Sequence, residues 1–218
     1  MVSAAYLLGI PHPTGYPLFT IFGKLFITII PFGNIAFRMN ILSALFASLC
    51  VMMTYFITLK LSTRAPEQPT STRIIPGIVA SLTLAFSSTF WEQAVLAEKY
   101  TLNALFATLI IFILLKWQDS RLPTPDSRLL YLFSFVLGLS FTHHMQTSFL
   151  LPASIFFILA VSWKNKKRLK ASGFWLKTFS FRTPHSPFRI FIKSLPQFCI
   201  LHFAFCIFLF ILPLTLWA

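Results

Sequence analysis

The sequence predicts an all-α membrane protein: a polytopic transmembrane helical bundle of about six spans, with an N-terminal interfacial or re-entrant helix. Of its 218 residues, 56% are hydrophobic and only 11% are charged. A soluble domain of this length could not bury so many apolar side chains. Several apolar segments approach the roughly 20 residues that cross a bilayer. Nine of the 18 Lys and Arg residues lie in one loop, between Lys164 and Lys193, as is typical of a cytoplasmic loop.

The net charge of +13 does not indicate nucleic-acid binding. The basic residues gather in loops between apolar spans, so the expected partners are membrane lipids and not nucleic acid. The cysteines at 50, 199 and 206 lie inside apolar segments without metal-ligand spacing. We therefore expect them to be small core residues, with neither a disulfide nor a zinc site.

Residues 1–34 are expected to form an outer-face loop and an interfacial helix. Three prolines and two glycines fall within residues 9–17, and Pro forbids a regular helix because it lacks the N–H and fixes φ. A rigid, non-helical loop beside apolar sequence is unfavourable in a membrane unless it lines a wet cavity. Residues 18–30 are apolar but short, which predicts an interfacial or re-entrant helix that ends at 31–34.

The rest of the chain is interpreted as a five-span core (35–163), a basic cytoplasmic loop (164–194) and a last span (195–218), all in a single transmembrane domain. The predicted spans cover residues 35–59, 74–90, 101–117, 129–142, 147–163 and 195–217. Tryptophans at span ends are expected to anchor the protein at the membrane interface. They are Trp91, Trp117 and Trp163.

The charge distribution predicts which loops share a side of the membrane. The loops at 60–73, 116–128 and 164–193 hold most of the Lys and Arg residues, so they are placed in the cytoplasm. The 9–17 loop, the 91–100 segment and the 143–146 junction then share the extracytoplasmic side. A site formed from their polar side chains is therefore predicted at that surface.

The proline-rich loop contributes His12 and Tyr16 as candidates. His12 lies between two prolines, so its ring would be held in place as a hydrogen-bond donor to an anion or as a proton carrier. The alternative is a histidine that only fixes the loop by bonding backbone. Tyr16 has two possible roles, an interfacial anchor or a substrate contact.

Two carboxylates near the third span are further candidates. Glu92 follows Thr89 in a Thr-x-x-Glu pattern that fits a capping box, so a structural role competes with a site role. Glu98 lies within one turn of a span, where acids are candidate functional residues. Its alternative is an ion pair with Lys99 or another nearby cation.

Adjacent residues on a helix point in different directions, so His143 and His144 do not form a metal-ligand pair. One of them is expected to face the site and the other backbone or lipid headgroups. Arg38 lies near the start of the first long span. Its side chain has two possible roles, which are to reach the lipid headgroups or to contact a phosphate at the site.

Four stretches carry a family resemblance, in the same order along the chain: residues 4–19 (AAYLLGIPHPTGYPLF), 38–45 (RMNILSAL), 90–105 (FWEQAVLAEKYTLNAL) and 138–144 (GLSFTHH). They resemble the DUF2723 family of multispan membrane proteins, which includes the TMEM260-like protein O-mannosyltransferases. The resemblance covers roughly residues 4 to 163.

The resemblance implies the fold and chemistry of the type C glycosyltransferases. Such an enzyme transfers a sugar, commonly mannose, from a polyprenyl- or dolichyl-phosphate donor to a protein or glycan acceptor, at the extracytoplasmic or luminal face of a bacterial inner membrane or ER membrane. Glu98 and His12 are then the candidate catalytic residues, and a divalent cation is a candidate cofactor. The candidates for contact with the lipid phosphate are His12, Tyr16, Arg38, Glu92, Lys99, Tyr100, His143 and His144.

In this family an acidic first outer loop typically supplies the general base, and here no Asp or Glu precedes Glu67. The chain is therefore expected to be a fragment, truncated at both ends, and inactive alone. Two other functions stay open: a non-catalytic membrane fragment, and a transporter or flippase-like carrier. A carrier would require polar residues at the midplane and broken helices in paired halves.

Overall fold

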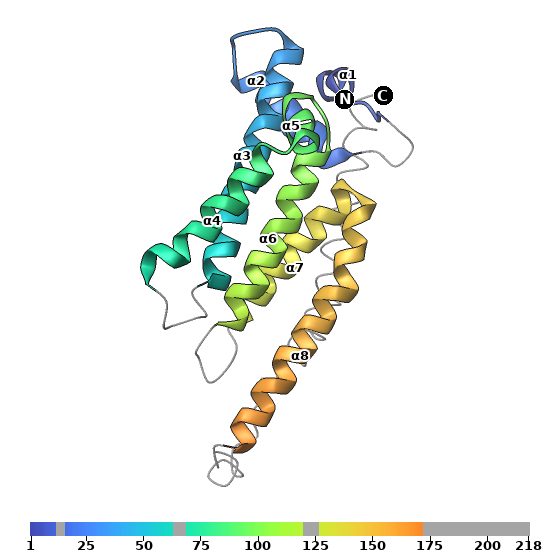
Figure 1. Cartoon of the computed structure of the whole chain (residues 1–218). Helices are drawn as coiled ribbons and strands as arrows, with labels where there is room; N and C mark the ends of the chain where they lie inside the picture. Colours follow the sequence, from blue (N-terminus) through green and yellow to red (C-terminus); the bar gives the residue numbers. More distant parts are fainter. Residues whose placement is uncertain (12–15, 63–68, 120–126, 172–218) are drawn as a thin grey trace.

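The computed structural model describes residues 1–11, 16–62, 69–119 and 127–171, and the regular structure in these ranges is helical (Figure 1). The all-α membrane class predicted from the sequence is confirmed. Helices α3, α4, α6, α7 and α8 run between the two ends of the molecule, and α1, α2 and α5 gather at one end (Figure 1). The helices are α1 (Val2–Leu7), α2 (Pro17–Ile29), α3 (Ile35–Ser62), α4 (Thr70–Ala85), α5 (Ser88–Val95), α6 (Tyr100–Gln118), α7 (Ser127–His143), the 3₁₀ helix η1 (Met145–Phe149) and α8 (Leu150–Ala171).

Fewer spans are found than the six predicted. By length and hydropathy, three helices in the described part can cross a membrane: α3, α6 and Met145–Trp163. The α4–α5 pair is bent by 62° and makes a fourth if it counts as one span. The predicted span at 129–142 is a shorter apolar helix, Arg128–His143, and the predicted span at 195–217 lies outside the described residues.

The break between α4 and α5 corrects two expectations. The span predicted at 74–90 ends at Ala85, and α5 begins at Ser88 after Ser87, its extended N-cap residue. Serines and threonines compete for backbone hydrogen bonds, which favours such a break without Gly or Pro. Because Thr89 is already inside α5, the predicted capping box with Glu92 does not form, and α5 has no side-chain cap.

Two apolar clusters hold the bundle together. The first joins α1, α2, α3 and α6, and the second joins α6, α7 and α8. Cys50 belongs to the first, as predicted for a core cysteine. Trp117 is 2% exposed in the second, so the prediction of an interface anchor is wrong at this residue: its ring packs inside the bundle. Trp91 and Trp163 are exposed.

The two ends of the bundle are chemically different. At one end Lys60 Nζ lies 2.9 Å from Asp119 Oδ2. This ion pair joins the last turn of α3 to the C-cap residue of α6, and both residues fall in loops predicted to be cytoplasmic. α8 continues to Ala171, so residues 164–171 of the predicted basic loop are helical; Lys and Arg are good helix formers. The starts of α2 and α6 and the α7–η1 junction meet at the other end.

Candidate functional site

Five of the predicted residues contact one another at this second end. Lys99 Nζ lies 4.5 Å from the ring centroid of Tyr16 and 4.8 Å from that of Tyr100. The rings of Tyr16 and His144 are stacked, with centroids 5.6 Å apart, and the rings of His143 and His144 lie 6.4 Å apart. We call these five residues the Lys99 cluster.

Helix ends position the cluster. Tyr16 and Lys99 are the N-cap residues of α2 and α6, and His143 is the last residue of α7. Pro17 begins α2, where its missing N–H costs nothing. Two helix N-termini therefore point their unpaired N–H groups and positive dipole ends toward this region, which favours an anion.

Of the two histidines, His143 is the one that faces backbone. It is 1% exposed, and its Nε2 lies 2.9 Å from the carbonyl oxygen of Lys99. A carbonyl only accepts, so Nε2 carries the proton and donates. Phe19 and Phe106 pack against the ring. His143 thus fixes the start of α6 from the side of α7.

His144 is partly buried and lies beside the ammonium group. Its Nδ1 accepts a hydrogen bond from the Gln146 backbone N–H at 3.1 Å, so in the neutral ring Nε2 carries the proton. Burial lowers the pKa of His144, and the positive charge of Lys99 lowers it further. His144 is therefore a neutral hydrogen-bond donor at neutral pH.

The two candidate carboxylates are not part of the cluster contacts. The alternative of a Glu98–Lys99 ion pair is not found, because no cation in the described part of the chain lies within 4.0 Å of Glu98. The Glu98 carbonyl accepts a hydrogen bond from Ser43 Oγ at 3.4 Å, which ties this segment to α3. Glu92 is exposed on α5.

Arg38, for which headgroup contact and phosphate contact were both open, binds backbone carbonyl groups in the structure. Its guanidinium donates to the carbonyl oxygens of Ile27, Pro31, Phe32 and Gly33, at 2.9 to 3.1 Å. These carbonyls lie at the C-terminal end of α2 and just after it, whereas Tyr16 precedes the other end of that helix. Arg38 therefore closes the α2–α3 turn.

His12, the remaining candidate, lies outside the described residues. Within the described residues, no group of three or more His, Cys, Asp or Glu side chains is arranged to hold a metal ion.

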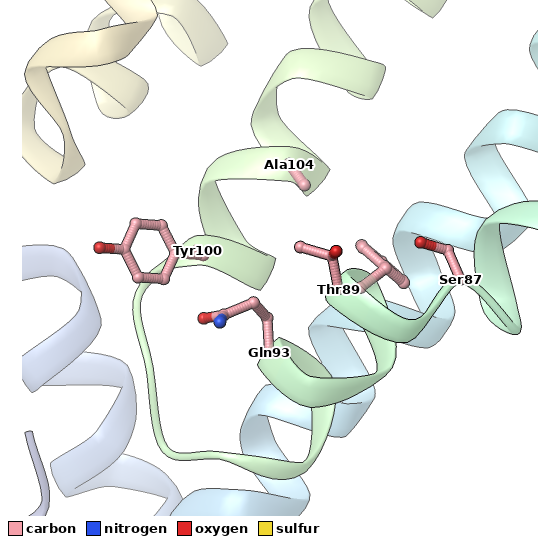
Figure 2. Close-up of a pocket in the computed structure, with 6 residues that line it drawn as sticks. Ser87, Thr89, Gln93, Tyr100 and Ala104 are labelled. Carbon is pink, nitrogen blue, oxygen red and sulfur yellow. The ribbon is translucent and has the colours of Figure 1, made fainter.

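A cavity of about 300 Å³ lies next to the cluster, between α5 and the start of α6 (Figure 2). Tyr100 belongs to both. The amino-acid sequence does not indicate the other lining residues, because they come together only through the break between α4 and α5, and no Gly or Pro marks that break. The lining residues are Ser87, Thr89, Phe90, Gln93, Tyr100 and Ala104.

The cluster and the cavity fall within one family match. The model of the protein O-mannosyl-transferase TMEM260 N-terminal domain matches residues 1–168. The chain belongs to the TMEM260 family. It is similar to the protein O-mannosyl-transferase TMEM260 of Mus musculus, with 31% identity over 140 residues, which is 64% of this chain and 19% of the mouse protein.

The TMEM260 family match extends to more distant relatives. The protein O-mannosyl-transferase tmem260 of Dictyostelium discoideum is 22% identical over 177 residues, which is 76% of this chain and 20% of that protein. The chain thus spans about a fifth of the length of these curated relatives. No solved structure matches the chain, so the type C architecture stays a prediction.

Proposed function

We propose that this chain forms part of a membrane glycosyltransferase that transfers mannose from a polyprenyl- or dolichyl-phosphate donor to a protein acceptor. The Lys99 cluster carries the proposal: one ammonium group, one neutral imidazole donor and two helix N-termini converge at one end of the bundle. Relatives named as protein O-mannosyl-transferases support the reaction class.

The charge and the hydrogen-bond donors of the Lys99 cluster are suited to stabilising a phosphate leaving group. The acceptor hydroxyl oxygen bonds to the anomeric carbon of the sugar, and the bond from that carbon to the phosphate oxygen breaks. The lipid phosphate leaves with the electron pair, and the acceptor proton passes to a carboxylate. Lys99 Nζ and His144 Nε2–H would stabilise the leaving phosphate by charge-assisted hydrogen bonds.

Within this chain we propose Glu98 as the base, in place of the first-loop acid that the family resemblance implies. It precedes Lys99 in the chain, is partly buried, and pairs with no cation in the described part of the structure. A carboxylate outside an ion pair keeps its oxygens available to accept a hydrogen bond from the acceptor hydroxyl.

We place the reaction at the extracytoplasmic or luminal face. The opposite end of the bundle has the Lys60–Asp119 pair and the basic C-terminal turns of α8, and basic segments of this kind stay in the cytoplasm. The cluster lies at helix ends rather than at the middle of the spans, which favours an enzyme over a carrier.

The test is mannose transfer in membranes that contain the complete gene product, with labelled polyprenyl phosphate mannose as donor. Lys99→Met is expected to lower kcat/KM about 10- to 100-fold, the effect of losing a charge-assisted hydrogen bond of about 1.5–3 kcal/mol. Lys24→Met is the matched control. Lys24 lies on α2, and its Nζ is 4.9 Å from the ring centroid of Tyr6, so this variant also removes an ammonium group from a tyrosine ring, but outside the Lys99 cluster. No transfer by the wild type, or equal rates in the two variants, would refute the proposal.

A further inference from the structure

His143 is a polar residue in an apolar environment. It is 1% exposed, and its ring lies against Phe19 of α2 and Phe106 of α6, with centroids 6.3 and 6.0 Å away. Its Nε2–H donates to the carbonyl oxygen of Lys99 at 2.9 Å, while its Nδ1 is buried and has no hydrogen-bond partner among the described residues. A side chain buried to this extent does not contact a phosphate itself.

Packing alone does not account for an imidazole at position 143. A buried nitrogen without a partner carries a free-energy cost that one neutral hydrogen bond does not exceed. An apolar ring of similar size would pack there without that cost. What the imidazole adds is one directed N–H group, and the acceptor of that group is the backbone of Lys99.

The carbonyl oxygen of Lys99 accepts two hydrogen bonds. One comes from the backbone N–H of Asn103 at 3.2 Å and belongs to α6 itself. The other comes from His143 on α7, so it fixes the start of α6 relative to a second helix. Because Lys99 is the N-cap residue of α6, this bond sets the position from which the lysine side chain extends.

His143 also contacts an aromatic partner of the lysine side chain. Its ring lies edge-on to the ring of Tyr16, with centroids 6.2 Å apart, and Lys99 Nζ lies over that same Tyr16 ring. His143 therefore touches both the backbone of Lys99 and the surface on which its ammonium group rests. Without the Nε2–H donor, the start of α6 is free to shift against α2 and α7.

We propose that His143 is a positioning residue of the phosphate site: it binds no ligand, and its Nε2–H holds the Lys99 backbone so that the ammonium group lies over Tyr16 and Tyr100. The inference rests on the proposed function, because it takes the Lys99 cluster as the site of the lipid phosphate. It separates the two histidines by role, since His144 would donate to the phosphate directly.

The experiment measures the affinity of the full chain in nanodiscs for a polyprenyl phosphate of defined chain length. His143→Phe keeps an aromatic ring and removes the donor, so it should weaken binding about five- to tenfold. His143→Gln places an amide N–H near the position of Nε2 and should bind within about twofold of the wild type. His143→Asn has a shorter side chain that does not reach the carbonyl, and it should bind as weakly as His143→Phe. The comparison of Gln with Asn decides the outcome if His143→Phe does not fold.

Asn103→Leu is the matched control. Asn103 Oδ1 accepts a hydrogen bond from Thr147 Oγ1 at 3.1 Å, which also joins α6 to the segment after α7, but this bond does not involve Lys99. The variant should lower the thermal midpoint and leave the affinity for polyprenyl phosphate within about twofold of the wild type. If Asn103→Leu weakens binding as much as His143→Phe, the cause is a general loosening of this junction, and the inference is refuted.

A double-mutant cycle shows whether His143 acts through Lys99. In the Lys99→Met background, His143→Phe should change the affinity by less than about twofold, because the group that His143 positions is gone. A loss as large as in the wild-type background would contradict the inference. If Lys99→Met weakens binding but His143→Phe and His143→Asn do not, the phosphate site stands and the inference alone fails. If the wild type and Lys99→Met bind equally, the phosphate site of the proposed function fails, and the inference fails with it.

Discussion

Lys99 lies where contacts from three helix ends converge. Its carbonyl is held by His143, and its ammonium group covers the rings of Tyr16 and Tyr100. The aromatic faces stabilise the cation without neutralising it, so its charge remains available to an anion. A carboxylate partner such as Glu98 would have cancelled that charge.

Replacing Lys99 by Met is expected to raise the pKa of His144. Burial lowers this pKa in the intact protein and the Lys99 charge lowers it further, so the variant loses the second cause and keeps the first. A histidine NMR titration in nanodiscs measures the change, with the His144 signal assigned from its loss in His144→Gln. Lys24→Met should leave the curve unchanged, and an unmoved curve in Lys99→Met would show that the ammonium group is not beside His144.

Sequence reasoning proposed the residue types of the cluster but not its contacts. The His143–Lys99 hydrogen bond joins residues 44 positions apart, and no local pattern encodes such a separation. Arg38 shows the same limit, because its carbonyl partners are created by the turn between α2 and α3.

Among the helices, the packing of α2 against α1 and α3 depends on one small residue. Gly23 of α2 faces Ala5 of α1 and Met39 of α3, which are both fully buried. Gly23 therefore lets α2 lie close to both α1 and α3. The apolar runs predicted α2, α3 and α6 well because helix length follows from hydropathy, whereas the α4–α5 break depends on weaker Ser and Thr preferences.

Gly23→Ala is expected to destabilise the protein by about 1–3 kcal/mol through overpacking. A Cβ at position 23 would lie 2.8 Å from Ala5 Cβ and 2.8 Å from Met39 Sδ. The free-energy cost of these close contacts outweighs the gain of up to about 1 kcal/mol in helix propensity. Thermal denaturation in detergent measures the loss. Gly9→Ala is the control, since a Cβ at Gly9 meets nothing within 4 Å; equal midpoints for the two variants would refute the packing argument.

The whole molecule is asymmetric along its long axis. One end carries the basic turns of α8 and the Lys60–Asp119 pair, and the other carries the Lys99 cluster and the cavity. The distribution of Lys and Arg predicted this separation from the sequence, because loops on one side of a membrane share their charge bias. It could not predict the cavity, which requires the bend of 62° between α4 and α5.

Side-specific cysteine labelling in intact membranes tests this arrangement most directly, with the three native cysteines replaced. A cysteine at Met145, which is 72% exposed beside His144, should react with an impermeant maleimide from the extracytoplasmic side, and polyprenyl phosphate mannose should slow the reaction. A cysteine at Leu61, at the Lys60 end, should react only after the membrane is opened. Labelling of both positions from the same side, or of position 145 only from the cytoplasm, would contradict the account.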